Sequence, residues 1–118
     1  MNGLNNVAIT GNLTRDPVLK EINGGENQVV SFGVGRSRKK ADSDERVSEF
    51  YEVEAWGTLA ANIARSLSKG DPVCVIGKLR YDQYEVDDIK RNRTYLVASH
   101  AGPDLRYREA EVKNNGSE

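Results

Sequence analysis

Apolar and polar residues alternate along several short stretches of this chain, as they do in strands that bury only one face. Turn-forming residues separate these stretches, most clearly Asp16 with Pro17 and the Asn-Gly-Gly run that begins at Asn23. The predicted strands cover residues 7–13 with a short continuation at 18–22, then 29–35, 47–56, 73–81 and 94–99.

Three apolar residues in the middle of the chain have a different period. Leu59, Ile63 and Leu67 are spaced by four residues, which places them on one face of a helix. Thr58 can cap the start of this helix, and a Lys-Gly pair supplies a usual stop signal. We therefore predict one helix over residues 58–69.

The predicted order is three strands, one helix and two strands. This order fits a mainly β, five-stranded OB-fold barrel whose helix lies between strands 3 and 4, and other small β-barrels share parts of the pattern. Residues 105–112 alternate apolar and charged side chains and are predicted as an extra C-terminal strand. We expect residues 1–112 to form the OB domain and residues 113–118 a short disordered end.

The composition indicates a single globular domain. The chain has 118 residues, of which 37% are hydrophobic, and it contains no run of the roughly 20 apolar residues that a membrane helix needs. Its one cysteine, Cys74, has no partner for an intrachain disulfide, so a reducing cytoplasm is the expected setting. A net charge of −1 is unusual for a nucleic-acid-binding domain. Any such binding must therefore depend on where the charges lie.

Strand parity predicts an exposed aromatic face on the 47–56 strand. Phe50 and Trp56 share one side with two glutamates, whereas the residues between them are mainly apolar and suit a core. Tryptophan and phenylalanine in strands are usually core residues. Glu52 and Glu54 lie on the same side, however, and charged neighbours favour exposure. Exposure and burial of the two rings are therefore about equally supported by the sequence. Exposed aromatic faces beside cations are what nonspecific binding of a single strand requires.

The 73–81 strand gives a similar division. Val73, Val75, Gly77 and Leu79 share a predicted core face, and Lys78, Arg80 and Tyr84 fall on the opposite parity. The polar segment 37–46 is predicted as a solvated loop. Cations at its start add to the candidate DNA-binding residues, which are Phe50, Trp56, Tyr84, Arg36, Arg38, Lys39, Lys78 and Arg80.

Motifs for catalysis, metal binding or cofactor binding are not found in this sequence. One histidine and one cysteine cannot make a recognisable zinc set. A GxxxxGK phosphate loop does not occur, and the Gly-Val-Gly run at 33–35 lacks the third glycine of a dinucleotide fingerprint. We therefore expect a protein that is not an enzyme and that uses no cofactor.

Five motifs in order resemble the bacterial single-stranded DNA-binding protein (SSB) family over residues 4–112. They are VAITGNLTRDP (7–17), VSF (30–32), FYEVEAWGTLA (50–60), LSKGDPV (67–73) and VIGKLR (75–80). The resemblance implies an OB fold, binding of single-stranded DNA in replication, recombination and repair, and a homotetramer. It also implies that bases stack on Phe50, Trp56 and Tyr84. The family usually has a further stacking aromatic in the loop after the second strand, but the corresponding position here falls near Lys40, so this chain departs from the pattern.

Two segments near the C-terminus carry further implications of this resemblance. GPDLRY (102–107) is similar to the actinobacterial branch of the family and its phages, in which a segment like 105–112 clamps two subunits together. The setting would then be a bacterial cytoplasm or nucleoid, or a phage host's cytoplasm. Family members usually carry an acidic tail that recruits replication enzymes. Residues 113–118 have one basic and one acidic side chain and no apolar one, so we do not expect them to recruit.

Two other functions remain open from the sequence. One is a primosome-type accessory OB-fold protein, a dimer that acts mainly through protein contacts. The other is an OB module that binds protein or sugar and no nucleic acid. The number of subunits distinguishes the first from an SSB, and indifference to oligonucleotides would indicate the second.

Overall fold

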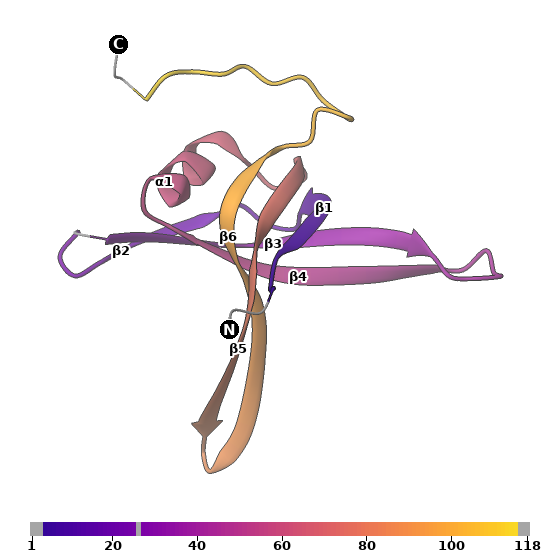
Figure 1. Ribbon diagram of the computed structural model, residues 1–118, viewed down its shortest axis with the longest axis horizontal. Coiled ribbons are helices and arrows are strands. Elements are labelled where there is room, and N and C mark those ends of the chain that lie inside the picture. Colours follow the sequence, from indigo (N-terminus) through magenta and orange to yellow (C-terminus); the bar gives the residue numbers. More distant parts are fainter. Residues whose placement is uncertain (1–3, 26, 116–118) are drawn as a thin grey trace.

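The computed structural model in Figure 1 describes residues 4–25 and 27–115, and in these residues six strands and one helix follow one another. The strands lie mostly where the alternation predicted them. Their bounds are β1 Val7–Leu13, β2 Val18–Ile22, β3 Asn27–Lys39, β4 Arg46–Trp56, β5 Pro72–Val86 and β6 Ile89–Pro103, with α1 Gly57–Ser66 between β4 and β5.

The strands close into a barrel. The sheet has the order β1-β5-β6-β4-β3-β2, and β1 also pairs with β3, which completes a ring of five strands. The predicted OB-fold barrel with its helix after the third long strand is confirmed. Its first strand is divided in two, because the chain breaks at Pro17, which has no backbone N–H to donate to a sheet. β2 then pairs with β3 alone.

The barrel interior is filled by branched and aromatic side chains. Phe32, Val34, Val53, Val73 and Val75 are all at least 99% buried. Helix α1 packs Ile63 against one side of this core, and Leu67 lies just beyond the helix end with 6% of its surface exposed. The apolar residues whose spacing predicted the helix thus form the face that the helix buries.

The helix itself is shorter than predicted. It begins at Gly57, its N-cap is Trp56 with no side-chain hydrogen bond, and it ends at Ser66. The expected cap at Thr58 is therefore wrong, because Thr58 already lies inside the first turn. Leu67 has extended backbone angles, so the chain leaves the helix before it reaches Lys69.

Two long hairpins project from the barrel in different directions (Figure 1). The β3–β4 arm is paired as far as Lys39 and Arg46, so the predicted loop at 37–46 is wrong except at 40–45. The β5–β6 hairpin is paired as far as Val86 and Ile89. Neither arm buries a face in the core, so their sequences lack the alternation by which a half-buried strand is recognised.

Close backbone packing fixes the base of the β5–β6 hairpin. A Cβ on Gly77 would collide with the backbone carbonyl oxygen of Val97 and lie 2.8 Å from Cα of Ala98. The register also shifts here, since Ile76 is opposite His100 while Gly77 is opposite Ala98. Beyond this bulge the hairpin leaves the barrel, and Leu79, which was predicted in the core, is 42% exposed.

Residues 105–112 form no strand within this chain. β6 ends at Pro103, the N–H of Asp104 donates to Pro72 O at 2.8 Å, and the N–H of Tyr107 donates back to Asp104 O at 3.1 Å. This turn directs the chain away from the sheet, so the segment has no neighbouring strand (Figure 1). Of the end predicted as disordered, residues 113–115 are irregular and 116–118 lie outside the described residues. Across the described ranges, α1 is too short to span a membrane.

Candidate nucleic-acid interface

The outer side of β4 exposes two aromatic rings. Phe50 is 73% exposed and Trp56 is 46% exposed, whereas Val53 and Ala55 on the other side are buried. The predicted parity of this strand is therefore confirmed. Backbone pairing with β3 keeps the two rings on one surface, since Phe50 lies opposite Gly35 and Trp56 lies opposite Val29.

This surface continues across the sheet onto the β5–β6 hairpin. Strand β6 runs parallel to β4, with Glu54 beside Val97, and Arg80 of β5 lies opposite Tyr95 of β6. Paired residues share a side of the sheet. The outer face of the protein therefore comprises Phe50, Glu52, Glu54 and Trp56 of β4, Arg91, Arg93, Tyr95 and Val97 of β6, and Lys78, Arg80, Asp82 and Tyr84 of β5.

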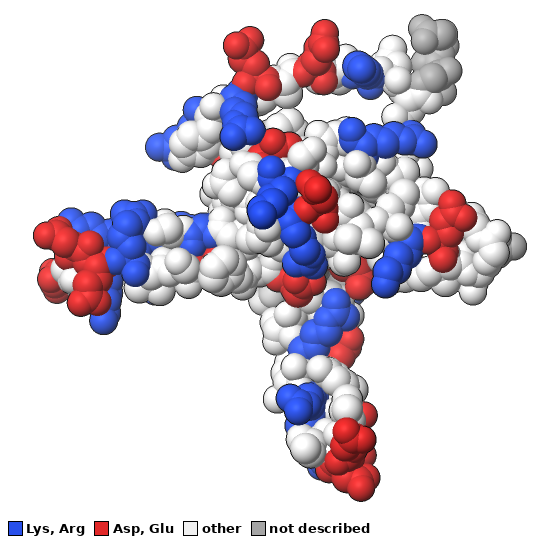
Figure 2. All heavy atoms as spheres, turned by 180° about the vertical axis from the view of Figure 1, so that it is seen from behind, with Lys and Arg blue, Asp and Glu red and all other residues white. Residues whose placement is uncertain are grey.

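Three candidate residues of the hairpin lie on this outer face. Tyr84 is 46% exposed and stands opposite Arg91, while Lys78 and Arg80 lie nearer the barrel on the same side. Within residues 4–25 and 27–115, neither Lys78 nor Arg80 forms an ion pair. Figure 2 shows Lys and Arg along both projecting hairpins, with Asp and Glu gathered at their tips.

The candidate cations of the β3–β4 arm are divided between its two faces. Lys39 has the parity of Gly35 and therefore lies on the side of Phe50, where it pairs with Asp44 at 3.3 Å. Arg36 and Arg38 have the parity of the core residue Val34 and lie on the opposite side. The sequence contained this signal, but the prediction of a loop at 37–46 stopped the parity from being followed.

Both arginines on that opposite side pair with one carboxylate. Nε of Arg36 lies 3.5 Å from Glu49 and Nε of Arg38 lies 2.7 Å from it. The hydrogen bond from Arg38 lowers the pKa of Glu49 and is the main cause that raises the pKa of Arg38. The structure therefore does not bring Arg36 and Arg38 together with Phe50 and Trp56.

Sequence reasoning missed Tyr95, Arg91 and Arg93. Leu96 and Ala98 are buried, so their neighbours Tyr95 and Val97 must face outward. That alternation was readable within the predicted 94–99 strand. The two arginines lie outside the predicted strands 73–81 and 94–99, although they occupy paired strand positions.

Each glutamate on the outer face is held by an arginine from another part of the chain. Glu52 pairs with Arg15 at 3.0 Å, and Glu54 lies 3.7 Å from Arg93. The indole N–H of Trp56 also donates to Glu54 at 2.9 Å. These contacts place both carboxylates on the outer face, each with a positive charge beside it.

Hydrogen bonding also fixes the orientation of Tyr95. Its hydroxyl donates to Asp82 at 3.0 Å, and this bond is the main cause that raises the pKa of Tyr95, so the phenol stays neutral. The guanidinium carbon of Arg93 lies 4.0 Å from the centre of the Tyr95 ring. A cation in this position is attracted to the ring face.

Comparison with known protein families gives a match over most of this chain. The profile of the single-strand binding protein family matches residues 4–104. The chain belongs to the single-strand binding protein family. That match covers all of the barrel, both hairpins and every residue of the outer face, and it leaves out most of the irregular segment after β6.

Relatives within the single-strand binding protein family are similar over most of this chain. Single-stranded DNA-binding protein 2 of Chlorobaculum tepidum is 35% identical over 72% of this chain and 60% of its own length. The single-stranded DNA-binding protein of Bifidobacterium longum is 32% identical over 94% of this chain and 53% of its own length. Single-stranded DNA-binding protein 1 of Clostridium acetobutylicum is 28% identical over 92% and 96% of the two chains. The chain thus spans little more than half of the first two relatives.

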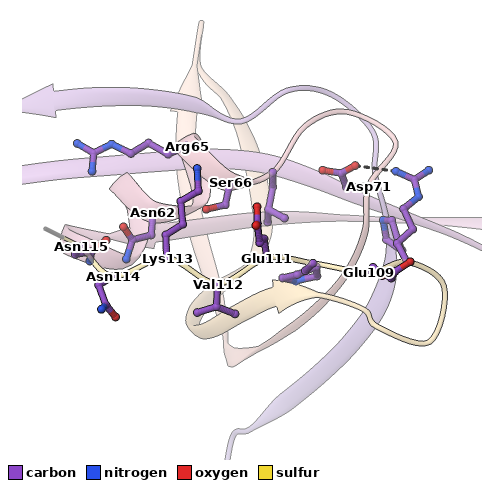
Figure 3. A pocket seen from close by; sticks show the side chains of 15 residues that line it. Asn62, Arg65, Ser66, Asp71, Glu109, Glu111, Val112, Lys113, Asn114 and Asn115 are labelled. Carbon is purple, nitrogen blue, oxygen red and sulfur yellow. Dashed lines mark hydrogen bonds and ion pairs between the residues drawn. The ribbon is translucent and has the colours of Figure 1, made fainter.

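One hollow of this family member lies away from the outer face. It has a volume of about 830 Å³ and is bounded by the end of α1 and the C-terminal segment, which Arg108 ties to Asp71 at 3.0 Å (Figure 3). None of the candidate DNA-binding residues lines it. Among residues 4–25 and 27–115, no cluster of His, Cys, Asp or Glu has the makings of a metal site.

Proposed function

We propose that this protein binds single-stranded DNA without sequence preference along its outer face, and that it is not an enzyme. The observation that carries the proposal is the continuous surface on which Phe50, Trp56 and Tyr84 stand beside Lys78 and Arg80. Bound in this way, the strand would be kept unpaired and protected during replication, recombination and repair. The names of the relatives support the choice of single-stranded DNA as the ligand.

Base stacking supplies the part of binding that tolerates any sequence. Every base has a π-face, so an exposed ring can accept any of them. Phe50 and Trp56 offer such rings on β4, and Tyr84 offers one on the β5–β6 hairpin. The three rings mark a path for the strand from the barrel onto the hairpin.

Cations near this path supply the electrostatic part. Lys78, Arg80 and Lys39 would neutralise phosphates, and Arg91 lies on the same face beside Tyr84. A protein with a net charge of −1 attracts a polyanion only through such a local surface. Arg36 and Arg38 would contact DNA only where a strand bends around the β3–β4 arm.

A titration with oligo-dT tests the proposal directly. Trp56 is the one tryptophan of the chain, so its fluorescence reports on the outer face alone. We expect oligo-dT to quench this fluorescence to saturation, and duplex DNA of the same length to quench it much less. Absence of binding to any single-stranded oligonucleotide would contradict the proposed function.

The salt dependence of binding should distinguish the two faces of the protein. Each phosphate neutralised on a single strand contributes about 0.7 to the slope of log K against log salt. Lys78→Gln with Arg80→Gln should therefore reduce the slope by up to about 1.4. Binding of oligo-dT measured from low to high salt gives this slope.

A matched double variant provides the control. Arg36→Gln with Arg38→Gln removes the same charge from the opposite face of the β3–β4 arm, and the slope should stay close to that of the unmodified protein. Equal reductions by the two double variants would show that DNA also contacts the face of the β3–β4 arm that carries Arg36 and Arg38.

We also propose a homotetramer in which residues 105–112 pair with another subunit. Residues 105–107 form a turn and 108–112 are irregular, and no strand of residues 4–25 and 27–115 pairs with the segment. It exposes Leu105 at 67% and Val112 at 94%. Backbone groups without a partner are a template for pairing with a second chain. A neighbouring subunit would cover these apolar side chains.

Mass in solution tests this assembly. We expect the 118-residue chain to be a tetramer, and a chain that ends at Pro103 to dissociate at higher protein concentration. Light scattering over a dilution series measures both. A monomer for the full chain would contradict the tetramer, and an equally stable tetramer after truncation would contradict the role of residues 105–112.

A further inference from the structure

Tyr95 occupies the part of the outer face that lies between the aromatic rings of β4 and Tyr84. It stands opposite Arg80, four residues before Tyr84 on β5, which is a distance of about 13 Å along a strand. On its other side, its neighbour Val97 lies beside Glu54 of β4. A DNA strand that runs from Trp56 to Tyr84 must therefore pass over the position of Tyr95.

The ring of Tyr95 has a fixed orientation that suits stacking of a flat ligand. The hydrogen bond from its hydroxyl to Asp82 fixes the ring edge, and partial burial limits its other motions. The guanidinium of Arg93, which is itself flat, covers the ring with its central carbon 4.0 Å from the ring centre. Guanidinium groups and bases stack on aromatic rings in the same way, so Arg93 occupies the place that a base would take.

Arg93 is held in this place only weakly. Its ion pair with Glu54 is long, at 3.7 Å, and the side chains of Arg93 and Glu54 are 41% and 18% exposed. A long ion pair whose cation is open to solvent contributes little to stability. A phosphate of a bound strand can therefore replace Glu54 as the partner of Arg93, while Glu54 keeps its hydrogen bond from the indole of Trp56.

We propose that Tyr95 is an additional base-stacking residue, covered by Arg93 in the free protein, and that Arg93 moves from the ring to a phosphate when a base stacks there. This inference rests on the proposed function, because it concerns the same strand on the same face. It adds a base site, and it gives Arg93 a different partner in each state.

Replacement of the ring tests the stacking. Tyr95→Ala should weaken oligo-dT binding about fivefold with an unchanged salt slope, since no charge is removed. Tyr95→Phe keeps the ring and should stay within about twofold of the unmodified protein. Tyr81→Ala is the matched control, because Tyr81 is exposed on the opposite face of the same hairpin. Equal losses from Tyr95→Ala and Tyr81→Ala would overturn the inference, as they would reflect the hairpin rather than the ring.

Replacement of Arg93 tests its movement from the ring to a phosphate. Arg93→Gln should lower the salt slope by about 0.7, because one phosphate contact is lost. An unchanged slope would overturn the transfer of Arg93 to a phosphate.

Photocrosslinking tests the contact without any substitution. An oligonucleotide with 5-iodouracil in place of thymine should crosslink to Tyr95, the one tyrosine of the tryptic peptide 94–106. Crosslinks to peptide 47–65, which holds Trp56, with none to 94–106 would overturn the role of Tyr95 and leave the proposed function standing. Failure of the unmodified protein to bind the oligonucleotide at all would overturn both.

Discussion

Replacement of Trp56 by alanine should weaken oligo-dT binding by about 1–3 kcal/mol, roughly 5- to 150-fold in the dissociation constant. The indole is 46% exposed on the outer face, so its loss removes a stacking surface without opening the barrel core. The salt slope should stay the same, because no charge changes. Anisotropy of a labelled oligonucleotide must be used, since the variant has no tryptophan left to report.

A second substitution separates stacking from the indole hydrogen bond. Trp56→Phe keeps an aromatic ring but loses the donation to Glu54 at 2.9 Å. It should retain most of the affinity, with a loss smaller than that of Trp56→Ala. Unchanged binding by a folded Trp56→Ala variant would show that the strand does not pass over this part of β4.

Replacement of Gly77 by alanine should lower the free energy of unfolding by about 3 kcal/mol. The added Cβ would collide with the backbone carbonyl oxygen of Val97 and approach Cα of Ala98 to 2.8 Å. Backbone atoms cannot move aside as a side chain can, so β5 and β6 would have to separate at the base of the hairpin. Thermal unfolding at a fixed protein concentration should show a melting temperature lower by roughly 10 °C or more.

Gly102→Ala provides the matched control for this prediction. Gly102 lies on β6, opposite Cys74 of β5, and a Cβ there would meet no heavy atom within 4 Å. Its effect should be within about 1 kcal/mol. Similar melting temperatures for the two variants would mean that the strands at Gly77 adjust more easily than their packing indicates.

Element type followed from local pattern wherever one face of a segment is buried. The alternation in β4 predicted both the buried position of Val53 and the exposed positions of Phe50 and Trp56. The spacing of Leu59, Ile63 and Leu67 predicted the helix. In each case the positions that face the barrel core recur at the repeat of the strand or helix and must be apolar. The sequence therefore shows the same repeat.

The alternation of apolar and polar residues did not predict strands where they leave the barrel. The β3–β4 arm and the outer part of the β5–β6 hairpin have no buried face, so polar residues occur on both sides and resemble a loop. These strands form through pairing with each other. Arg36 and Arg38 were assigned to the DNA-binding set as cations at the start of a predicted loop, whereas the paired arm places them on the face opposite to Phe50.

The sequence by itself determined the order of strands and helix along the chain, most of the predicted core positions of the barrel, and which side of β4 carries Phe50 and Trp56. Only the tertiary structure decided which of the distant side chains share a surface. Tyr95 lies on the surface of Trp56 because β6 pairs in parallel with β4, and Arg15 reaches Glu52 across 37 positions of the chain. Local periodicity reports whether a residue faces the core, but it carries no information on which strand lies beside it. That choice depends on closure of the barrel as a whole.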